Sequence, residues 1–168
     1  MKRKITAISI IITAVVIIIA FSHSVFEYTE KNQNIIQDIE KDFFGDEIYS
    51  ELQIECTADD REAIQPVLDF ADKAFSYLGD GDKYELFGEL GKYCYNDYTG
   101  NTHITSERHN IYFLTAKLND ETGYLWVEYF HEGHSESNEF TTIRDRKSRW
   151  TLEKTDGKWV VSDILEHP

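Results

Sequence analysis

The pattern of hydrophobic and polar positions divides the chain into three parts, and the first is the most distinctive. Residues 5–21 form an uncharged run rich in Ile, Val and Ala, and Lys2, Arg3 and Lys4 precede it directly. A helix needs about 17–25 such residues to cross the hydrocarbon core of a bilayer. The run therefore predicts a transmembrane helix within residues 1–26, and the three cations predict that its N-terminus stays in the cytoplasm.

Two fates remain open for this segment. A cleaved signal peptide usually has an apolar core of about 7–15 residues, followed by a cleavage site between small residues. The longer run favours an uncleaved anchor, although cleavage near Ser22 or Ser24 is left open. The anchor predicts a single-pass protein of the cytoplasmic membrane with its C-terminal domain outside, and cleavage predicts a secreted protein.

The second part, residues 27–47, is predicted to be a juxtamembrane spacer with a short amphipathic stalk helix. Its apolar residues recur at helical spacing, and the helix is expected to end near Gly45. These residues are Ile35, Ile36, Ile39 and Phe43. The third part, residues 48–168, is predicted to be one extracytoplasmic domain, and the alternating pattern of residues 48–56 predicts that it begins with a strand.

Two helices are expected next. Thr57 with Asp60 predicts a capped helix start, and apolar residues on one face continue to Leu78 before Gly79. Pro66 predicts either a kink or a regular helix that begins only around Gln65. A second helix is predicted to begin at Asp82 and to present an apolar face as far as the cysteine at position 94.

The remaining residues predict a β-meander. Residues 96–110 are polar and predict a loop, and strands are expected over 112–118, 124–131, 140–154 and 159–165. Asp156-Gly157 is a strong hairpin signal between the last two strands. Helices followed by an antiparallel meander predict an α+β domain, here behind an N-terminal transmembrane helix.

The closing hairpin carries a resemblance to a known family. A Trp at position 150 is followed by Gly157, Trp159, Val161 and Ile164. This run resembles the last hairpin of the nuclear transport factor 2-like (SnoaL-like) superfamily, and the resemblance covers residues 57–168. It implies a cone of helices against a strongly curved antiparallel sheet, closest to uncharacterised extracytoplasmic members from bacteria. That superfamily includes isomerases, dehydratases, cyclases and binding modules, so the resemblance implies no particular activity and no catalytic residue.

Charge narrows the choice of partners. The formal net charge of −14 argues against nucleic acid as a partner, because phosphate binding needs a cationic surface. A local basic stretch covers residues 144–158 and includes Arg146 and Arg149. It is expected to be a solvated strand face, and the alternative is that it binds an acidic partner or the acidic half of the same molecule.

The two cysteines, Cys56 and Cys94, leave their redox state open. Outside the membrane they could form a disulfide if the two predicted helices bring them together. Two buried free thiols are an equal alternative, because a free cysteine behaves as a small hydrophobe.

Histidines provide the candidates for metal binding and acid–base chemistry. Residues 131–136 are expected to form a polar β-turn without a metal, and the alternative is that a turn at Gly133 brings His131 and His134 together as metal ligands. In the predicted loop, Asp97, His103 and His109 are the acid–base candidates, because a histidine oriented by a carboxylate can move protons near neutral pH. Ordinary surface polarity is the alternative for all three.

Tyrosines provide the candidates for a ligand pocket. Tyr93, Tyr98 and Tyr112 could line the open mouth of a cone, or they could simply pack with their hydroxyls near water. With Arg146 and Arg149, they are the candidate binding residues.

Together these patterns favour a non-enzymatic binding or assembly module without a cofactor. Its expected contacts are the lipid bilayer through residues 5–21 and an unknown protein or small ligand, with homo-oligomerisation left open. The alternative is a small-molecule isomerase or lyase that uses a cone-shaped pocket. An inward-facing acid or histidine beside an open cavity would favour the enzyme, and a filled cone would favour the binding module.

Overall fold

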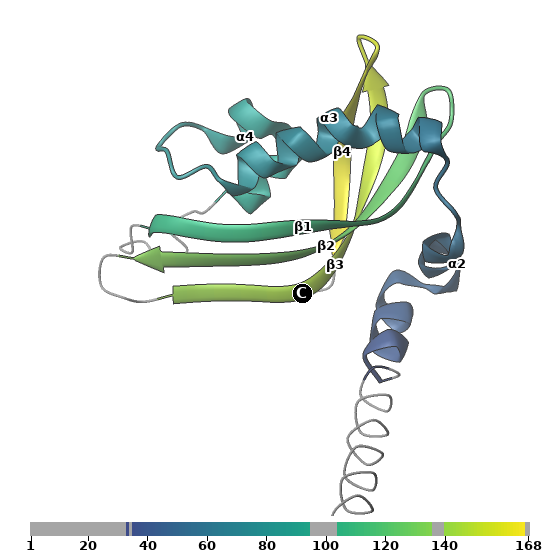
Figure 1. Cartoon of the computed structure of the whole chain (residues 1–168), viewed down its shortest axis with the longest axis horizontal. Helices are drawn as coiled ribbons and strands as arrows, with labels where there is room; N and C mark the ends of the chain where they lie inside the picture. Colours follow the sequence, from purple (N-terminus) through teal and green to yellow (C-terminus); the bar gives the residue numbers. More distant parts are fainter. Residues whose placement is uncertain (1–32, 34, 95–103, 136–139, 167–168) are drawn as a thin grey trace, which may run out of the picture. The chain divides into compact units, whose positions relative to one another are not determined.

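The computed structural model describes residues 33, 35–94, 104–135 and 140–166 (Figure 1). The chain divides into two compact units, Met1–Phe43 and Phe44–Pro168. Residues 35–44 are helical, and the helix ends at Gly45, where φ is +81°. The predicted transmembrane segment lies outside the described residues. No helix among the residues that are described is long and apolar enough to cross a membrane.

The strand predicted over residues 48–56 is wrong. The chain instead forms the short helix α2 (Asp46–Ser50) and the 3-10 helix η1 (Glu51–Gln53). Its apolar residues Ile48, Tyr49 and Leu52 also fit helical spacing, and they pack against Phe44 and Trp126. The acidic residues of the first turn of α2 favour the helix as well, because they face the positive end of its dipole.

Helix α3 (Ala58–Phe75) confirms the first predicted helix. The Thr57 hydroxyl accepts a hydrogen bond from the backbone N–H of Asp60 at 3.1 Å, as the capping pattern predicts. Pro66 lies inside the helix, so the alternative in which the regular part begins near Gln65 is wrong. One face of α3 is buried in the main core, through Ile64, Val67, Ala71, Ala74 and Phe75.

The second predicted helix is shorter than expected. Asp82 caps α4 (Lys83–Phe87) by accepting from the N–H groups of the next turn, as predicted. The chain then turns at Gly88, where φ is +57°, and continues as the 3-10 helix η2 (Gly88–Tyr93). The positive φ at Gly88 ends the α-helix, which is why the apolar pattern up to Cys94 does not form one continuous helix.

Four antiparallel strands form one sheet in the order β1-β2-β3-β4. They are β1 (Ile104–Leu118), β2 (Thr122–Ser135), β3 (Phe140–Thr155) and β4 (Lys158–Glu166). The predicted loop over 96–110 is wrong from Ile104 onward, and Gly133 pairs with Thr141 inside the sheet instead of forming a turn. The Asp156-Gly157 hairpin is confirmed, with φ of +51° and +76° at its two residues, as a type I′ turn requires.

The sheet is curved, and other elements pack against parts of both of its faces. Each pair of neighbouring strands has at least one register shift, and such bulges bend a sheet. Helix α3 lies along the inside of the bend (Figure 1), where Leu125 and Val127 of β2 join its core. On the opposite face, Tyr124 and Trp126 pack against Phe44 and the α2–η1 segment. The α+β class with helices on a curved antiparallel sheet is therefore confirmed.

Candidate functional site

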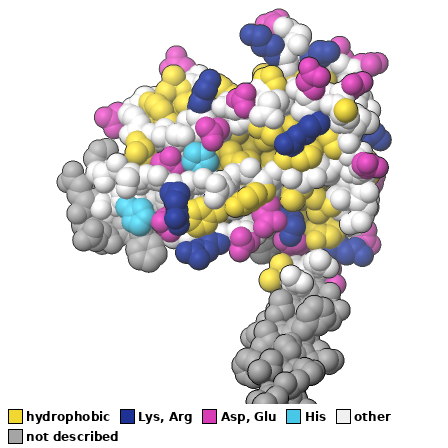
Figure 2. Space-filling model, viewed as in Figure 1, with side chains coloured by type: hydrophobic (Ala, Val, Ile, Leu, Met, Phe, Trp, Pro, Cys, Tyr) yellow, Lys and Arg dark blue, Asp and Glu magenta, His cyan; other side chains and the backbone are white. Residues whose placement is uncertain are grey.

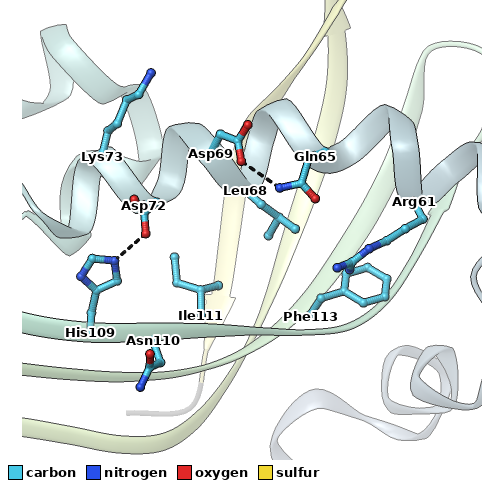
Figure 3. Close-up of a pocket in the computed structure, with 10 residues that line it drawn as sticks. All are labelled: Arg61, Gln65, Leu68, Asp69, Asp72, Lys73, His109, Asn110, Ile111 and Phe113. Atoms are coloured by element: carbon cyan, nitrogen blue, oxygen red, sulfur yellow. Dashed lines mark hydrogen bonds and ion pairs between the residues drawn. The ribbon is translucent and has the colours of Figure 1, made fainter.

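The candidate site is a cleft between α3 and the edge strand β1, which we call the α3–β1 cleft (Figure 3). Its helical side is formed by residues that recur every three or four positions, namely Arg61, Gln65, Leu68, Asp69 and Asp72. Its strand side is formed by His109, Ile111 and Phe113, which alternate along β1 and therefore share one face. The cleft has a volume of about 730 Å³.

Two contacts join the helix to the strand at the ends of the cleft. The Arg61 guanidinium lies 3.8 Å from the centre of the Phe113 ring. At the other end, Asp72 Oδ1 lies 3.0 Å from His109 Nε2. Arg61 and Asp72 are separated by about 17 Å along the helix. Phe113 and His109 are separated by about 13 Å along the strand. These two spacings are similar, so the side chains can span the small difference and form both contacts at once. Figure 2 shows hydrophobic side chains below α3, with a histidine at one end of them and a basic side chain at the other.

His109 is held by carboxylates on both ring nitrogens. Its Nε2 lies 3.0 Å from Asp72 Oδ1, and its Nδ1 lies 2.9 Å from Glu107 Oε2. Each ring nitrogen therefore has a carboxylate within hydrogen-bond distance, one from α3 and one from β1. The His109 side chain is 10% exposed, whereas Asp72 is 70% exposed. The ring is therefore buried behind a carboxylate that faces solvent.

His131 lies beside His109 as its partner across the β1–β2 ladder. Burial, and then the neighbouring His109, lower the pKa of His131 to about 4. Its Nε2 is 3.8 Å from Glu107 Oε2, and its ring centre is 4.8 Å from that of Phe75. With that pKa, His131 is neutral at pH 7.

The two histidines that the sequence offers as alternative metal ligands, His131 and His134, do not lie together. Because Gly133 continues the strand, His131 is buried while His134 is exposed and bonds Glu132 Oε1 at 2.8 Å. Residues three apart in a strand point to opposite faces, so the two rings cannot share an ion. Among the residues that the structure describes, no group of three or more His, Cys, Asp or Glu side chains could hold a metal ion.

The interior of the bend is filled by a hydrogen-bonded aromatic cluster. The Tyr93 and Ser148 hydroxyls lie 2.9 Å apart, and Trp150 Nε1 donates to both at 2.9 Å. Tyr129 and Tyr93 donate to Glu166 Oε2 at 3.0 and 3.2 Å. Burial, and then the Glu166 charge, raise the pKa of Tyr93 well above its usual range. Tyr93 is thus a packed core residue and not a pocket wall.

The other predicted binding residues are not gathered at one site. Tyr112 is 55% exposed on β1, and Arg146 lies opposite Tyr129 in the β2–β3 ladder. Arg149 forms an ion pair with Glu51 on the outer face of the sheet. Tyr98, and the acid–base candidates Asp97 and His103, lie outside the described residues.

Both cysteines are free thiols in the structure. Cys94 is buried in the main core, and Cys56 packs against the same cluster while remaining partly exposed. Of the two alternatives left open by the sequence, the structure has the free thiols.

Sequence reasoning found His109 but missed its carboxylate partners and Arg61. Glu107 could have been found if residues 104–118 had been predicted as a strand, because residues two positions apart in a strand lie on the same face. Asp72 could have been placed on one stripe of α3 with Arg61, but nothing in the sequence says which strand that stripe faces.

No family model and no curated protein matches the chain. Among solved structures, the chain is similar to a protein from Novosphingobium aromaticivorans that is named as a candidate aromatic ring hydroxylase. The two are 12% identical, and the match covers 67% of this chain and 96% of that one, with a TM-score of 0.48. An identity this low transfers no residue role.

Proposed function

We propose that the chain is a non-enzymatic binding or assembly module of the nuclear transport factor 2-like type. In this proposal residues 5–21 hold it at the outer side of the cytoplasmic membrane, and the α3–β1 cleft contacts its partner. The observation that supports it best is the filled interior of the bend, where Trp150 is fully buried and Tyr93 is 5% exposed. A cone-pocket enzyme needs an open cavity at that place.

The chemistry of the histidines supports the same proposal. A general base needs a free lone pair within reach of the substrate. In His109 both nitrogens already bond carboxylates, and His131 is buried behind it. The pair therefore suits a structural role in which it fastens α3 to the sheet.

The proposed ligand of the cleft is dipolar, with an apolar body. Leu68, Ile111 and Phe113 offer an apolar floor, while Arg61 is exposed at one end and Asp72 at the other. An anionic group would lie near Arg61 and a cationic group near Asp72. A small zwitterion or a peptide segment of a protein partner satisfies this description.

Ligand-observed NMR on the full chain in lipid nanodiscs tests the proposal. Short zwitterionic apolar peptides are the probes, compared with the same peptides acetylated and amidated. We expect saturable binding of the zwitterions, lost in Arg61→Gln and Asp72→Asn and kept in Arg144→Gln, an exposed arginine outside the cleft. Equal binding by all three variants would contradict the proposal.

The alternative, an isomerase or lyase, is favoured by one observation, namely that the Asp72–His109 pair opens onto a cavity. Recovery of every bound probe unchanged after prolonged incubation is expected from a binding module. If a bound compound is converted to a product, and if His109→Gln abolishes that conversion, the chain is an enzyme instead.

A further inference from the structure

A second concave surface lies on the other side of α3, toward the opposite edge of the sheet. We call it the apolar groove, and it is lined by α3, the α4–η2 segment and the β3–β4 hairpin. Its volume is about 730 Å³, within the range of about 300–1,000 Å³ that is usual for small-molecule sites. It shares no lining residue with the α3–β1 cleft.

The groove exposes large apolar side chains from two helices. Phe70 of α3 is 41% exposed and Leu86 of α4 is 48% exposed. The Phe70 and Phe87 ring centres lie 5.5 Å apart with the rings tilted at 46°, and Trp159 lies on the hairpin side. Val160 follows Trp159 in β4, so its side chain lies on the opposite face of the hairpin. Apolar side chains gathered in this way usually mark a binding surface, unlike single exposed ones.

Charge defines the rest of the ligand. Lys154 and Lys158 line the groove at the hairpin, and no acidic residue lines it, in a chain with 31 acidic and 17 basic residues. The Lys154 ammonium lies 5.5 Å from the centre of the Trp159 ring, at the border between the apolar and charged parts. Within the described residues neither lysine has an ion-pair partner.

We infer that the apolar groove binds an anionic amphiphile, with an alkyl or ring body against Phe70, Leu86 and Trp159 and one carboxylate or phosphate against Lys154. The volume suits a small molecule, and the lysine beside an acid-free apolar wall selects a negative head group. The inference does not rest on the proposed function of the α3–β1 cleft, because the two surfaces are lined by different residues.

Trp159 supplies the readout. Trp126 and Trp150 are fully buried, whereas Trp159 is only partly buried and lines the groove. The probe is 12-bromododecanoate, whose bromine quenches tryptophan on contact, and 12-bromododecanol is the matched neutral probe. Both are titrated into the full chain in phosphatidylcholine nanodiscs. We expect saturable quenching by the acid that Trp159→Phe removes, and weaker binding of the alcohol.

The lysine is tested by Lys154→Gln, with Lys117→Gln, an exposed lysine of β1, as the matched control. The Lys154 variant is expected to weaken binding of the acid about threefold and to leave binding of the alcohol unchanged, as expected for one exposed charge pair. Leu86→Glu, on an exposed position, is expected to weaken binding of the acid as well.

Nanodiscs that contain brominated phosphatidylglycerol distinguish a bilayer lipid from a free acid as the source of the head group. Quenching that depends on the lysine supports the inference with either anionic probe. Quenching by the bromo acid identifies a free acid as the ligand, and quenching by brominated phosphatidylglycerol identifies a bilayer lipid. The inference would be overturned if the acid and the alcohol bound equally well, or if no quenching were saturable. It would also be overturned if brominated phosphatidylcholine quenched as strongly as the anionic probes, or if replacing the lysine left binding of the acid unchanged.

Discussion

Arg149 and Glu51 form a two-point ion pair that fastens η1 to β3. Arg149 Nε lies 2.7 Å from Glu51 Oε2, and Arg149 Nη2 lies 2.9 Å from Glu51 Oε1. Both side chains are 17% exposed, and Trp126 Nε1 also donates to Glu51 at 2.8 Å. The basic stretch of the sequence therefore binds the acidic half of the same molecule at this position, which is one of the alternatives that the sequence left open.

Replacing Arg149 is expected to destabilise the fold. Arg149→Met leaves the mostly buried Glu51 carboxylate without its bidentate partner, and we expect a loss of about 3 kcal/mol in the free energy of unfolding. Arg149→Lys is expected to recover only part of this, because an ammonium cannot form the planar two-point contact. Urea denaturation of the full chain in mild detergent measures both.

A double-mutant cycle with Glu51→Gln isolates the pair. We expect a clear coupling energy between positions 51 and 149, whereas Arg144→Lys, on the exposed part of β3, should change stability by less than about 0.5 kcal/mol. Additive effects of the two substitutions would show that the ion pair does not contribute to stability.

His131 is expected to make the fold sensitive to acid. Its pKa is about 4 in the folded chain and 6.5 in its ordinary state, so between these values the unfolded chain binds one more proton. Stability therefore falls as the pH drops through this window, by up to about 3 kcal/mol from this residue. His131→Gln removes the titration, and its stability should fall less steeply than that of the native chain.

The comparison must separate His131 from its neighbours. His109, Glu107 and Asp72 lie in the same cluster and carry ionisable side chains. Denaturation curves of both chains at pH values from 7 to 4 give the difference in slope, in which contributions common to both cancel. Parallel curves would mean that His131 is already protonated in the folded chain or remains accessible to water.

The Tyr93 hydroxyl is expected to stabilise the filled interior. Tyr93→Phe removes its contacts with Ser148, Trp150 and Glu166, and we expect a loss of about 1–3 kcal/mol. Tyr112→Phe is the matched control, since Tyr112 is 55% exposed and should change stability by less than about 0.5 kcal/mol. Equal effects would contradict the assignment of Tyr93 to the core.

Local signals in the sequence predicted the elements that local chemistry determines. Thr57 caps α3 and Asp82 caps α4 because their side chains satisfy nearby backbone N–H groups. Asp156-Gly157 forms its hairpin because both residues adopt positive φ. These features depend on residues within a few positions, so the sequence contains all the information they need.

The errors arose where tertiary contacts choose between two local patterns. Ile48 and Leu52 fit either a strand or a helix, and their packing against Phe44 and Trp126 accompanies the helix. Gly133 suggested a turn, but its neighbours β1 and β3 extend the sheet through it. The Asp72–His109 contact joins residues 37 positions apart, and no periodicity predicts which helical stripe faces which strand.

The two thiols are expected to differ sharply in reactivity. Cys94 is 2% exposed, and burial raises its pKa to about 11, so little of the reactive thiolate is present at pH 8. Cys56 is partly exposed and does not share that protection. We expect one thiol of the native chain to react promptly with Ellman's reagent and the second only on the timescale of unfolding.

Cys56→Ser should remove the fast phase and Cys94→Ser the slow one. Absence of both phases in a chain purified without reductant, with their appearance after reduction, would show instead that the two cysteines form a disulfide.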